Sequence, residues 1–231
     1  MKKYNHIFFD LDHTLWDFKT NSRHTLVEIY THFNLEDRGV ESERLFIEVY
    51  EKYNHRMWAD YRNGKMSKKT LRTERFRQSL YHVGVKDVAL SLEIADYYVD
   101  NSPVKTTLFP GAIDVLSELN SRYEMHIITN GFEEIQDIKM TQSGLHPFFN
   151  AVITSEKAGA KKPHPAIFEY SLKLANATPE ESLMIGDNQL VDIEGAQKIG
   201  MDGVFFNPEE EDKLVIPCYE VKSLKELLNF L

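Results

Sequence analysis

The stretch that decides the fold is Phe8-Phe9-Asp10-Leu11-Asp12-His13-Thr14-Leu15, near the start of a chain of 231 residues. It completes a short, mostly apolar run, Tyr4–Phe9, which meets an acid at Asp10. Such a run is typical of a strand buried on both faces of a parallel sheet. Because burying an ionised carboxylate is costly, Asp10 needs a cation or hydrogen-bond donors beside it.

Asp10 and Asp12 stand two residues apart, so their carboxylates repel each other if both are ionised and close together. A hard cation such as Mg²⁺ relieves this repulsion, because it binds carboxylate and carbonyl oxygens. Two carboxylates can also divide a reaction, one as nucleophile and the other as general acid and base. A structural role is open as well, since Asp12 or Thr14 could cap a following helix.

Four further apolar runs end in small, polar or acidic residues: Met125–Ile128, Ala151–Thr154, Leu183–Ile185 and Gly203–Phe206. Patterns with helical spacing separate and follow them, at Pro110–Arg122, Glu133–Ser143, Pro165–Asn176, Val191–Ile199 and Ser223–Leu231. This alternation predicts an α/β fold built on a doubly wound parallel sheet. Ligands of such sheets bind beyond the carboxyl ends of the strands.

The segment from Asp17 to about Asn101 is rich in aromatic and charged residues and has no buried strand run. Helical periodicity marks four blocks, at Asn21–Phe33, Glu41–Tyr61, Ser67–Val83 and Val88–Asp100. An insertion of about 80 residues is too long for a simple loop, so we expect it to form an all-helical cap domain. The expected domains are a core of residues 1–16 and 103–231 and a cap of residues 17–102.

The composition narrows the possible partners. The chain has 27 lysines and arginines against 36 acidic residues, a net charge of −9, which argues against a nucleic-acid polymer or an anionic membrane as partner. Its single cysteine excludes an intramolecular disulfide. No apolar stretch approaches the ~18–20 residues of a membrane span, and the first residues do not resemble a secretory signal. We therefore expect a cytoplasmic protein, either a monomer or a homodimer.

Three more segments place polar groups after predicted strands. Thr129-Asn130-Gly131 offers a hydroxyl and amides to an anion, although it is also a good turn sequence. Lys162 precedes a proline, which favours extended backbone and a fixed ammonium group, although most lysines lie at the surface. Gly186-Asp187-Asn188, with Asp192, could bind a metal ion or cap a helix.

Together, the acid pair, the threonine, the lysine and the second acid pair resemble, in type and order, the motifs of the haloacid dehalogenase-like hydrolase superfamily. The resemblance covers residues 4–16 and about 103–231, and the helical insertion stands where that superfamily carries its cap. It implies a Rossmann-like core. Dehalogenases of the superfamily lack the second catalytic aspartate and the metal, so Asp12 favours a Mg²⁺-dependent phosphatase.

The resemblance also implies roles for the motif residues. Asp10 would be the nucleophile that forms an aspartyl-phosphate, and Asp12 would protonate the leaving oxygen and then activate water. Lys162 would neutralise charge on Asp10 and on the phosphoryl group. These roles suit phosphoryl transfer, which depends on positioning and charge neutralisation.

The remaining implied roles concern binding. Thr129 and the amides of Asn130 and Gly131 would hold phosphoryl oxygens together with Lys162. The implied Mg²⁺ ligands are Asp10, Asp187, Asp192 (directly or through water) and the backbone carbonyl of Asp12.

The implied substrate is a small phosphorylated metabolite. The stretch from Asp10 to Phe18 resembles the bacterial pyrimidine nucleotidases, which act on nucleoside 5′-monophosphates, although sugar-phosphate phosphatases of the superfamily look similar. Several side chains could meet a base or a phosphate, although residues of these types also form helical cores: Trp16, Phe18, Trp58, Tyr61, Arg62 and Arg75. A phosphomutase, or a phospho-ligand binding module without turnover, remains an alternative. The nine histidines show no zinc-like spacing.

Overall fold

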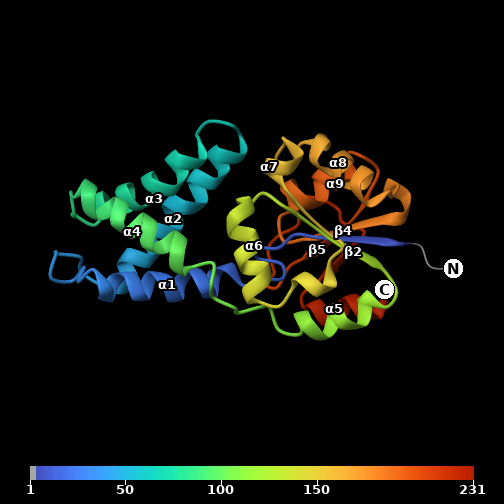
Figure 1. Cartoon of the computed structure of the whole chain (residues 1–231), viewed down its shortest axis with the longest axis horizontal. Helices are drawn as coiled ribbons and strands as arrows, with labels where there is room; N and C mark the ends of the chain where they lie inside the picture. The colour runs from blue at the N-terminus through green and yellow to red at the C-terminus, as the bar shows by residue number, and fades with distance from the viewer. Residues whose placement is uncertain (1–3) are drawn as a thin grey trace. The chain divides into compact units, whose positions relative to one another are not determined.

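The computed structural model describes residues 4–231. The chain divides into two compact units, one made of the residues up to Phe18 together with Thr106–Leu231, the other of Lys19–Lys105. The first unit holds the sheet, and the second consists of helices α1 to α4 (Figure 1). A membrane-spanning helix is not found anywhere in residues 4–231.

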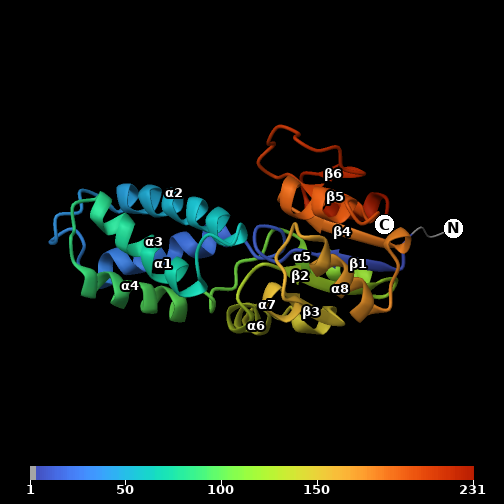
Figure 2. The ribbon, with the colours of Figure 1, turned by 90° about the horizontal axis from the view of Figure 1, so that it is seen from above.

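The sheet of the first unit has six parallel strands in the order β3-β2-β1-β4-β5-β6, which can be followed in Figure 2. The strands are β1 (His6–Phe9), β2 (Glu124–Thr129), β3 (Ala151–Thr154), β4 (Ser182–Gly186), β5 (Asp202–Phe206) and β6 (Tyr219–Val221). This order confirms the predicted doubly wound sheet. The sequence did not predict β6, because it is short, partly exposed and carries no apolar run.

Helices cover both faces of the sheet (Figure 1). Because side chains alternate along a strand, Ile7 and Phe9 face one side and Phe8 faces the other. Ile7 and Phe9 share a core cluster with residues of α5 (Ala112–Asn120), α6 (Glu133–Gln142) and η4 (Leu224–Asn229). Phe8 belongs to a second cluster, with residues of α8 (Pro165–Ala175) and α9 (Glu194–Gln197). The remaining short elements are η1 (His146–Phe148), α7 (Ser155–Ala158), η2 (Pro179–Glu181) and η3 (Gln189–Ile193).

Two predicted helices of this unit have a different form. The single helix expected over Val191–Ile199 is a π-helical turn, η3, followed by one turn of α-helix, α9. Asp192 lies in the π-helical turn, where its carboxylate accepts a hydrogen bond from the Asn188 N–H and pairs with Lys162. The segment expected as a helix over Ser223–Leu231 is the 3₁₀ helix η4.

The second unit is a helical bundle of α1 (Phe18–His32), α2 (Glu43–Arg62), α3 (Lys68–His82) and α4 (Val88–Asn101). Side chains accept hydrogen bonds from the first turns of the last three of these helices, at Ser42, Ser67 and Asp87. A core of its own holds the bundle together, and its buried members include Leu26, Ile29, Phe46, Tyr50, Phe76 and Tyr98.

Candidate functional site

The carboxyl ends of three neighbouring strands bring the sequence motifs together. Asp10 directly follows β1, Thr129 ends β2 and Asp187 directly follows β4. The Asp10 N–H donates to the carbonyl of Ile185 at 2.9 Å, which fixes the backbone at the end of β1 against β4. The motifs, far apart in the sequence, therefore meet where α/β sheets bind their ligands.

Lys162 lies at the centre of this site. Its Nζ atom is 2.7 Å from Asp10 Oδ1, 2.7 Å from Asp192 Oδ1 and 2.7 Å from the carbonyl oxygen of Ile128. The lysine is only 2% exposed, so these three oxygens replace the water that an ammonium group needs. The lysine is therefore part of the site and not a surface residue.

Asn130 positions Lys162 through its backbone. The side-chain Nδ2 of Asn130 donates to the carbonyl of Lys162 at 2.9 Å, and the Lys162 N–H donates to Asn130 Oδ1 at 2.8 Å. Both ends of the amide are thereby engaged. The side chain of Asn130 thus holds the loop that carries the lysine, a contact that the sequence did not predict.

Three carboxylates form a cluster at this edge. One oxygen from each of Asp10, Asp187 and Asp192 lies within 4.8 Å of the others. Burial raises the pKa of Asp187 to about 8, with a further contribution from Asp192, while Lys162 and a hydrogen bond from Thr14 (3.3 Å) oppose the rise. Burial also raises the pKa of Asp10 well above its usual range, despite Lys162.

The charges in this cluster do not balance without a cation. When all three carboxylates are ionised, Lys162 offsets only one of their negative charges. A divalent ion would supply the missing charge, and carboxylate oxygens are the ligands that Mg²⁺ and Ca²⁺ prefer. The residues present therefore fit a hard divalent cation.

Asp192 joins this cluster because of a glycine in β4. A Cβ atom on Gly186 would lie 2.4 Å from Asp192 Oδ2, so only glycine leaves room for that carboxylate. The same oxygen accepts the Asn188 N–H at 3.0 Å, while Oδ1 faces Lys162. Asp192 can therefore bind a backbone N–H through Oδ2 and take part in the charged cluster through Oδ1, so the two predicted roles are compatible.

Asp12 lies outside the cluster and has partners of its own. Its carboxylate pairs with the ammonium group of Lys139 and accepts a hydrogen bond from Gln136 Nε2 at 2.8 Å. Burial acts to raise the pKa of Asp12, but Lys139 and Gln136 outweigh it, and the pKa is lowered. The surroundings therefore shift the pKa values of the two acids of the first motif in opposite directions, that of Asp12 downward and that of Asp10 upward.

Gln136 also organises the threonine. Its Nε2 donates to Thr129 Oγ1 at 2.7 Å as well as to Asp12, and the Gly131 N–H donates to the same Oγ1 at 3.0 Å. With both acceptor positions of the hydroxyl taken, the Thr129 O–H is left as a donor. The Gly131 N–H donates within its own loop in this structure, and a contact with a phosphoryl oxygen stays a prediction. A Cβ on Gly131 would lie 2.1 Å from Gln136 Nε2.

Gln136 and Lys139 were not among the predicted site residues, although the sequence carries a signal for them. They stand three residues apart on α6, hence on one helix face, and both are buried. Trp16 supports Lys139, whose Nζ lies 4.0 Å from the centre of the indole ring. Trp16 is completely buried, which favours a core role over contact with a base.

Arg75 also belongs to a core. It is 5% exposed, donates to Asn54 Oδ1 at 2.9 Å and lies over the ring of Tyr98. Its surroundings are the interior of the helical bundle, so it does not meet a substrate phosphate in this arrangement.

Comparison with known proteins agrees with this site. The sequence model of the haloacid dehalogenase-like hydrolases matches residues 4–200. The chain belongs to this family. The resemblance predicted from the motifs is thus confirmed, and the chain is a hydrolase of the haloacid dehalogenase-like type.

Members of the family resemble the chain over its whole length. Pyrimidine 5′-nucleotidase PynA of Streptococcus pneumoniae is 33% identical to this chain, and the match covers 99% of this chain and 95% of PynA. Pyrimidine 5′-nucleotidase YjjG of Escherichia coli is 29% identical, and the match covers 99% of this chain and 98% of YjjG. The putative HAD-hydrolase YfnB from Bacillus subtilis is 29% identical in sequence. Its crystal structure, bound to magnesium, superposes on this chain with a TM-score of 0.88, and the match covers 99% of this chain and 98% of YfnB.

Proposed function

We propose that the chain is a Mg²⁺-dependent phosphomonoester hydrolase that acts through an aspartyl-phosphate on Asp10, with pyrimidine nucleoside 5′-monophosphates as its substrates. The observation that carries this proposal is the separation of the two first-motif acids. Asp10 lies in the carboxylate cluster with Lys162, and Asp12 is held apart by Lys139 and Gln136. One acid is thus placed for attack and the other for proton transfer.

In the first step an oxygen of Asp10 attacks phosphorus, and the bond from phosphorus to the ester oxygen breaks. Lys162 offsets the negative charge that the nucleophile and the phosphoryl group bring together. The Thr129 hydroxyl donates to a phosphoryl oxygen, as its two accepted hydrogen bonds direct. The leaving oxygen takes a proton from Asp12 and departs as an alcohol.

In the second step Asp12 removes a proton from water, which attacks phosphorus, releases phosphate and restores the Asp10 carboxylate. Lys139 and Gln136 keep Asp12 in the ionised form that this step needs. The first step needs the protonated form instead. Asp12 therefore enters the first step protonated, and the proton that it takes from water in the second step restores this form for the next turnover.

Mg²⁺ would be held by Asp10, Asp187 and Asp192, with the Asp12 backbone carbonyl as the further ligand implied by the sequence. The bound ion would supply charge neutralisation at the phosphoryl oxygens. Support comes from the cluster's unbalanced charge and from YfnB, the structural relative bound to magnesium.

The substrate class rests on the relatives. PynA and YjjG are both named as pyrimidine 5′-nucleotidases, and each matches nearly the whole chain, helical unit included. Because the insert of such a fold supplies residues beyond the common motifs, likeness over the insert favours a shared substrate class.

The test is phosphate release from a panel of phosphomonoesters, with Mg²⁺ and with EDTA. The panel holds pyrimidine and purine nucleoside 5′-monophosphates, sugar phosphates and glyceraldehyde 3-phosphate, and the control enzyme is Asp10→Asn. We expect Mg²⁺-dependent release with the highest kcat/KM for pyrimidine monophosphates, and none from Asp10→Asn. Release confined to sugar phosphates would overturn the substrate class alone, and no release from any ester would overturn hydrolysis itself.

A further inference from the structure

A second group of possible metal ligands lies at the opposite end of the same strands. His6 begins β1, Glu124 begins β2 and His126 lies two residues further along β2. In the parallel register His6 stands beside Glu124, and Phe8 stands beside His126. Residues side by side, or two apart on one strand, share a face of the sheet. The fold therefore brings together two histidines 120 positions apart in the sequence.

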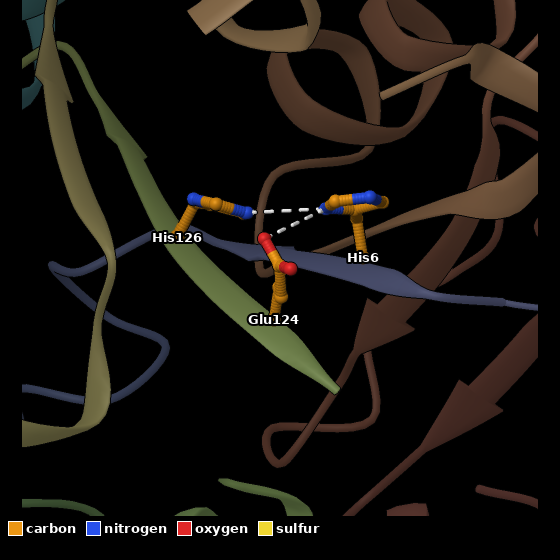
Figure 3. Close-up of side chains that lie close together, drawn as sticks. All are labelled: His6, Glu124 and His126. Atoms are coloured by element: carbon orange, nitrogen blue, oxygen red, sulfur yellow. Dashed lines mark hydrogen bonds and ion pairs between the residues drawn. The ribbon is translucent and has the colours of Figure 1, made fainter. Parts of the chain in front are cut away.

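The side chains converge on one point, as Figure 3 shows. His6 Nδ1 lies 3.4 Å from His126 Nε2 and 3.8 Å from Glu124 Oε2, and one donor atom from each residue lies within 4.8 Å of the others. Ligands bound about 2.0–2.2 Å from a tetrahedral Zn²⁺ are separated by about 3.3–3.6 Å. The distance between the two nitrogens is in this range. The 3.8 Å from His6 Nδ1 to Glu124 Oε2 is slightly longer, and all three donor atoms lie within 4.8 Å of one another.

Direct bonding explains these distances less well. A strong N–H hydrogen bond spans about 2.7–3.2 Å, so 3.4 Å between the imidazole nitrogens is long. The 3.8 Å between His6 and Glu124 is near the limit of ion pairing. Among the described residues, the other ring nitrogen of His126 is buried without a hydrogen-bond partner. The two contacts that His6 makes within this group are therefore longer than a strong hydrogen bond or a close ion pair.

The donor chemistry differs from that of the carboxylate cluster. Two imidazoles and one carboxylate suit Zn²⁺ and its transition-metal neighbours, whereas three carboxylates suit Mg²⁺. A histidine binds a metal ion through its neutral imidazole, and both His6 and His126 are buried. The Glu124 side chain is 61% exposed, which gives an ion a route from solvent.

We propose that His6, Glu124 and His126 form a binding site for a divalent transition-metal ion of the Zn²⁺ type, separate from the carboxylate cluster. The ion would join the starts of β1 and β2, with water completing its coordination. Its role would be to stabilise the sheet, because the site lies at the edge remote from Asp10.

The test is calorimetric titration of the whole protein with Zn²⁺ in the presence of excess Mg²⁺, which fills the carboxylate cluster. The variants are Glu124→Gln and His6→Gln, and the matched control is Asp187→Asn, which alters the other cluster. We expect one Zn²⁺ per chain in the wild type and in Asp187→Asn, and affinity weaker by about 100-fold or more in the two site variants. Glu124→Gln changes an exposed side chain, so its fold is preserved, and an unchanged circular dichroism spectrum checks this.

Thermal unfolding gives a second readout. Zn²⁺ at about 100 times its Kd should raise the Tm of the wild type by about 5–10 °C, and should leave the Tm of Glu124→Gln within error. No saturable binding to the wild type would overturn the proposal. Binding that survives in Glu124→Gln and His6→Gln but is lost in Asp187→Asn would overturn it as well, because Zn²⁺ would then occupy the carboxylate cluster.

Discussion

Mg²⁺ binding by this protein should depend steeply on pH, because the ion must displace a proton from Asp187. In the metal-free protein burial raises the pKa of this carboxyl to about 8, and Asp192 contributes to the rise. Below pH 8 most molecules therefore carry a proton where the ion binds. Lowering the pH from 8 to 6 is the perturbation, and weaker Mg²⁺ binding is the expected result.

The size of the effect follows from the competition between proton and metal. If one proton with a pKa of about 8 must leave, the apparent Kd rises about 2-fold at pH 8, ~10-fold at pH 7 and ~100-fold at pH 6 relative to high pH. Between pH 8 and pH 6 the change is about 50-fold, or about 2 kcal/mol. Asp10, whose pKa is also raised, can release a second proton and steepen the dependence.

Isothermal titration calorimetry with MgCl₂ at pH 6, 7 and 8 measures this dependence. Repeating each titration in two buffers of different ionisation enthalpy counts the protons released. Thr14→Val is the matched variant, because it removes the hydrogen bond from Thr14 Oγ1 that lowers the pKa of Asp187. In this variant the midpoint of the dependence should move to higher pH.

A flat result would refute the reasoning. If the Kd for Mg²⁺ changes by less than about 3-fold from pH 8 to pH 6, and no proton is released, the carboxylates are already ionised without metal. Lys162 and the other surroundings would then be enough to keep the cluster ionised, and the charge argument for a divalent ion would fail. An unchanged midpoint in Thr14→Val would show that its hydrogen bond does not stabilise the charged form.

Three further changes test other parts of the site. Lys139→Met removes the largest of the interactions that lower the pKa of Asp12, so the acidic limb of the kcat profile should move to higher pH; an unmoved limb would assign that limb to another group. Gly131→Ala places a Cβ against Gln136 Nε2 and should lower kcat about 10-fold or more with little change in Tm; wild-type kinetics would show that the Gln136 contact is dispensable. The raised pKa of Asp187 costs the metal-free protein stability as pH rises from about 4 to about 8. In EDTA at pH 8, Asp187→Asn should therefore melt above the wild type, and a lower Tm would contradict that sign.

The sheet and its motifs were predictable from the sequence because each depends on local patterns. An apolar run buried on both faces and ended by a polar residue marks β1, β2 and β4, and the parallel arrangement then forces Asp10, Thr129 and Asp187 to one edge. The strand β6 lacks such a pattern. Its three residues form a strand because they pair with β5, and no local sequence pattern marks this contact.

The supporting contacts of the site were not predictable in the same way. Lys139 and Asp12 are 127 positions apart, and nothing local marks them as partners. The exchange of hydrogen bonds between Asn130 and the Lys162 backbone likewise depends on how two loops meet. Sequence patterns identify polar groups that are costly to bury. The hydrogen-bond and charge partners that offset this cost come from distant segments, which only the tertiary structure brings near.

The proximity of His6 and His126 could not be predicted from the sequence for the same reason. Their spacing in the sequence gives no zinc motif, yet the register of β1 and β2 places His6 and His126 3.4 Å apart. Strand β1 then carries a candidate metal ligand at each end, His6 and Asp10, four positions or about 13 Å apart along the strand. Changes at sites this far apart, without shared partners, usually add independently. A Zn²⁺ effect that disappears in Glu124→Gln while the Mg²⁺ response persists would therefore show two separate sites, and coupled losses would show that β1 transmits strain between its ends.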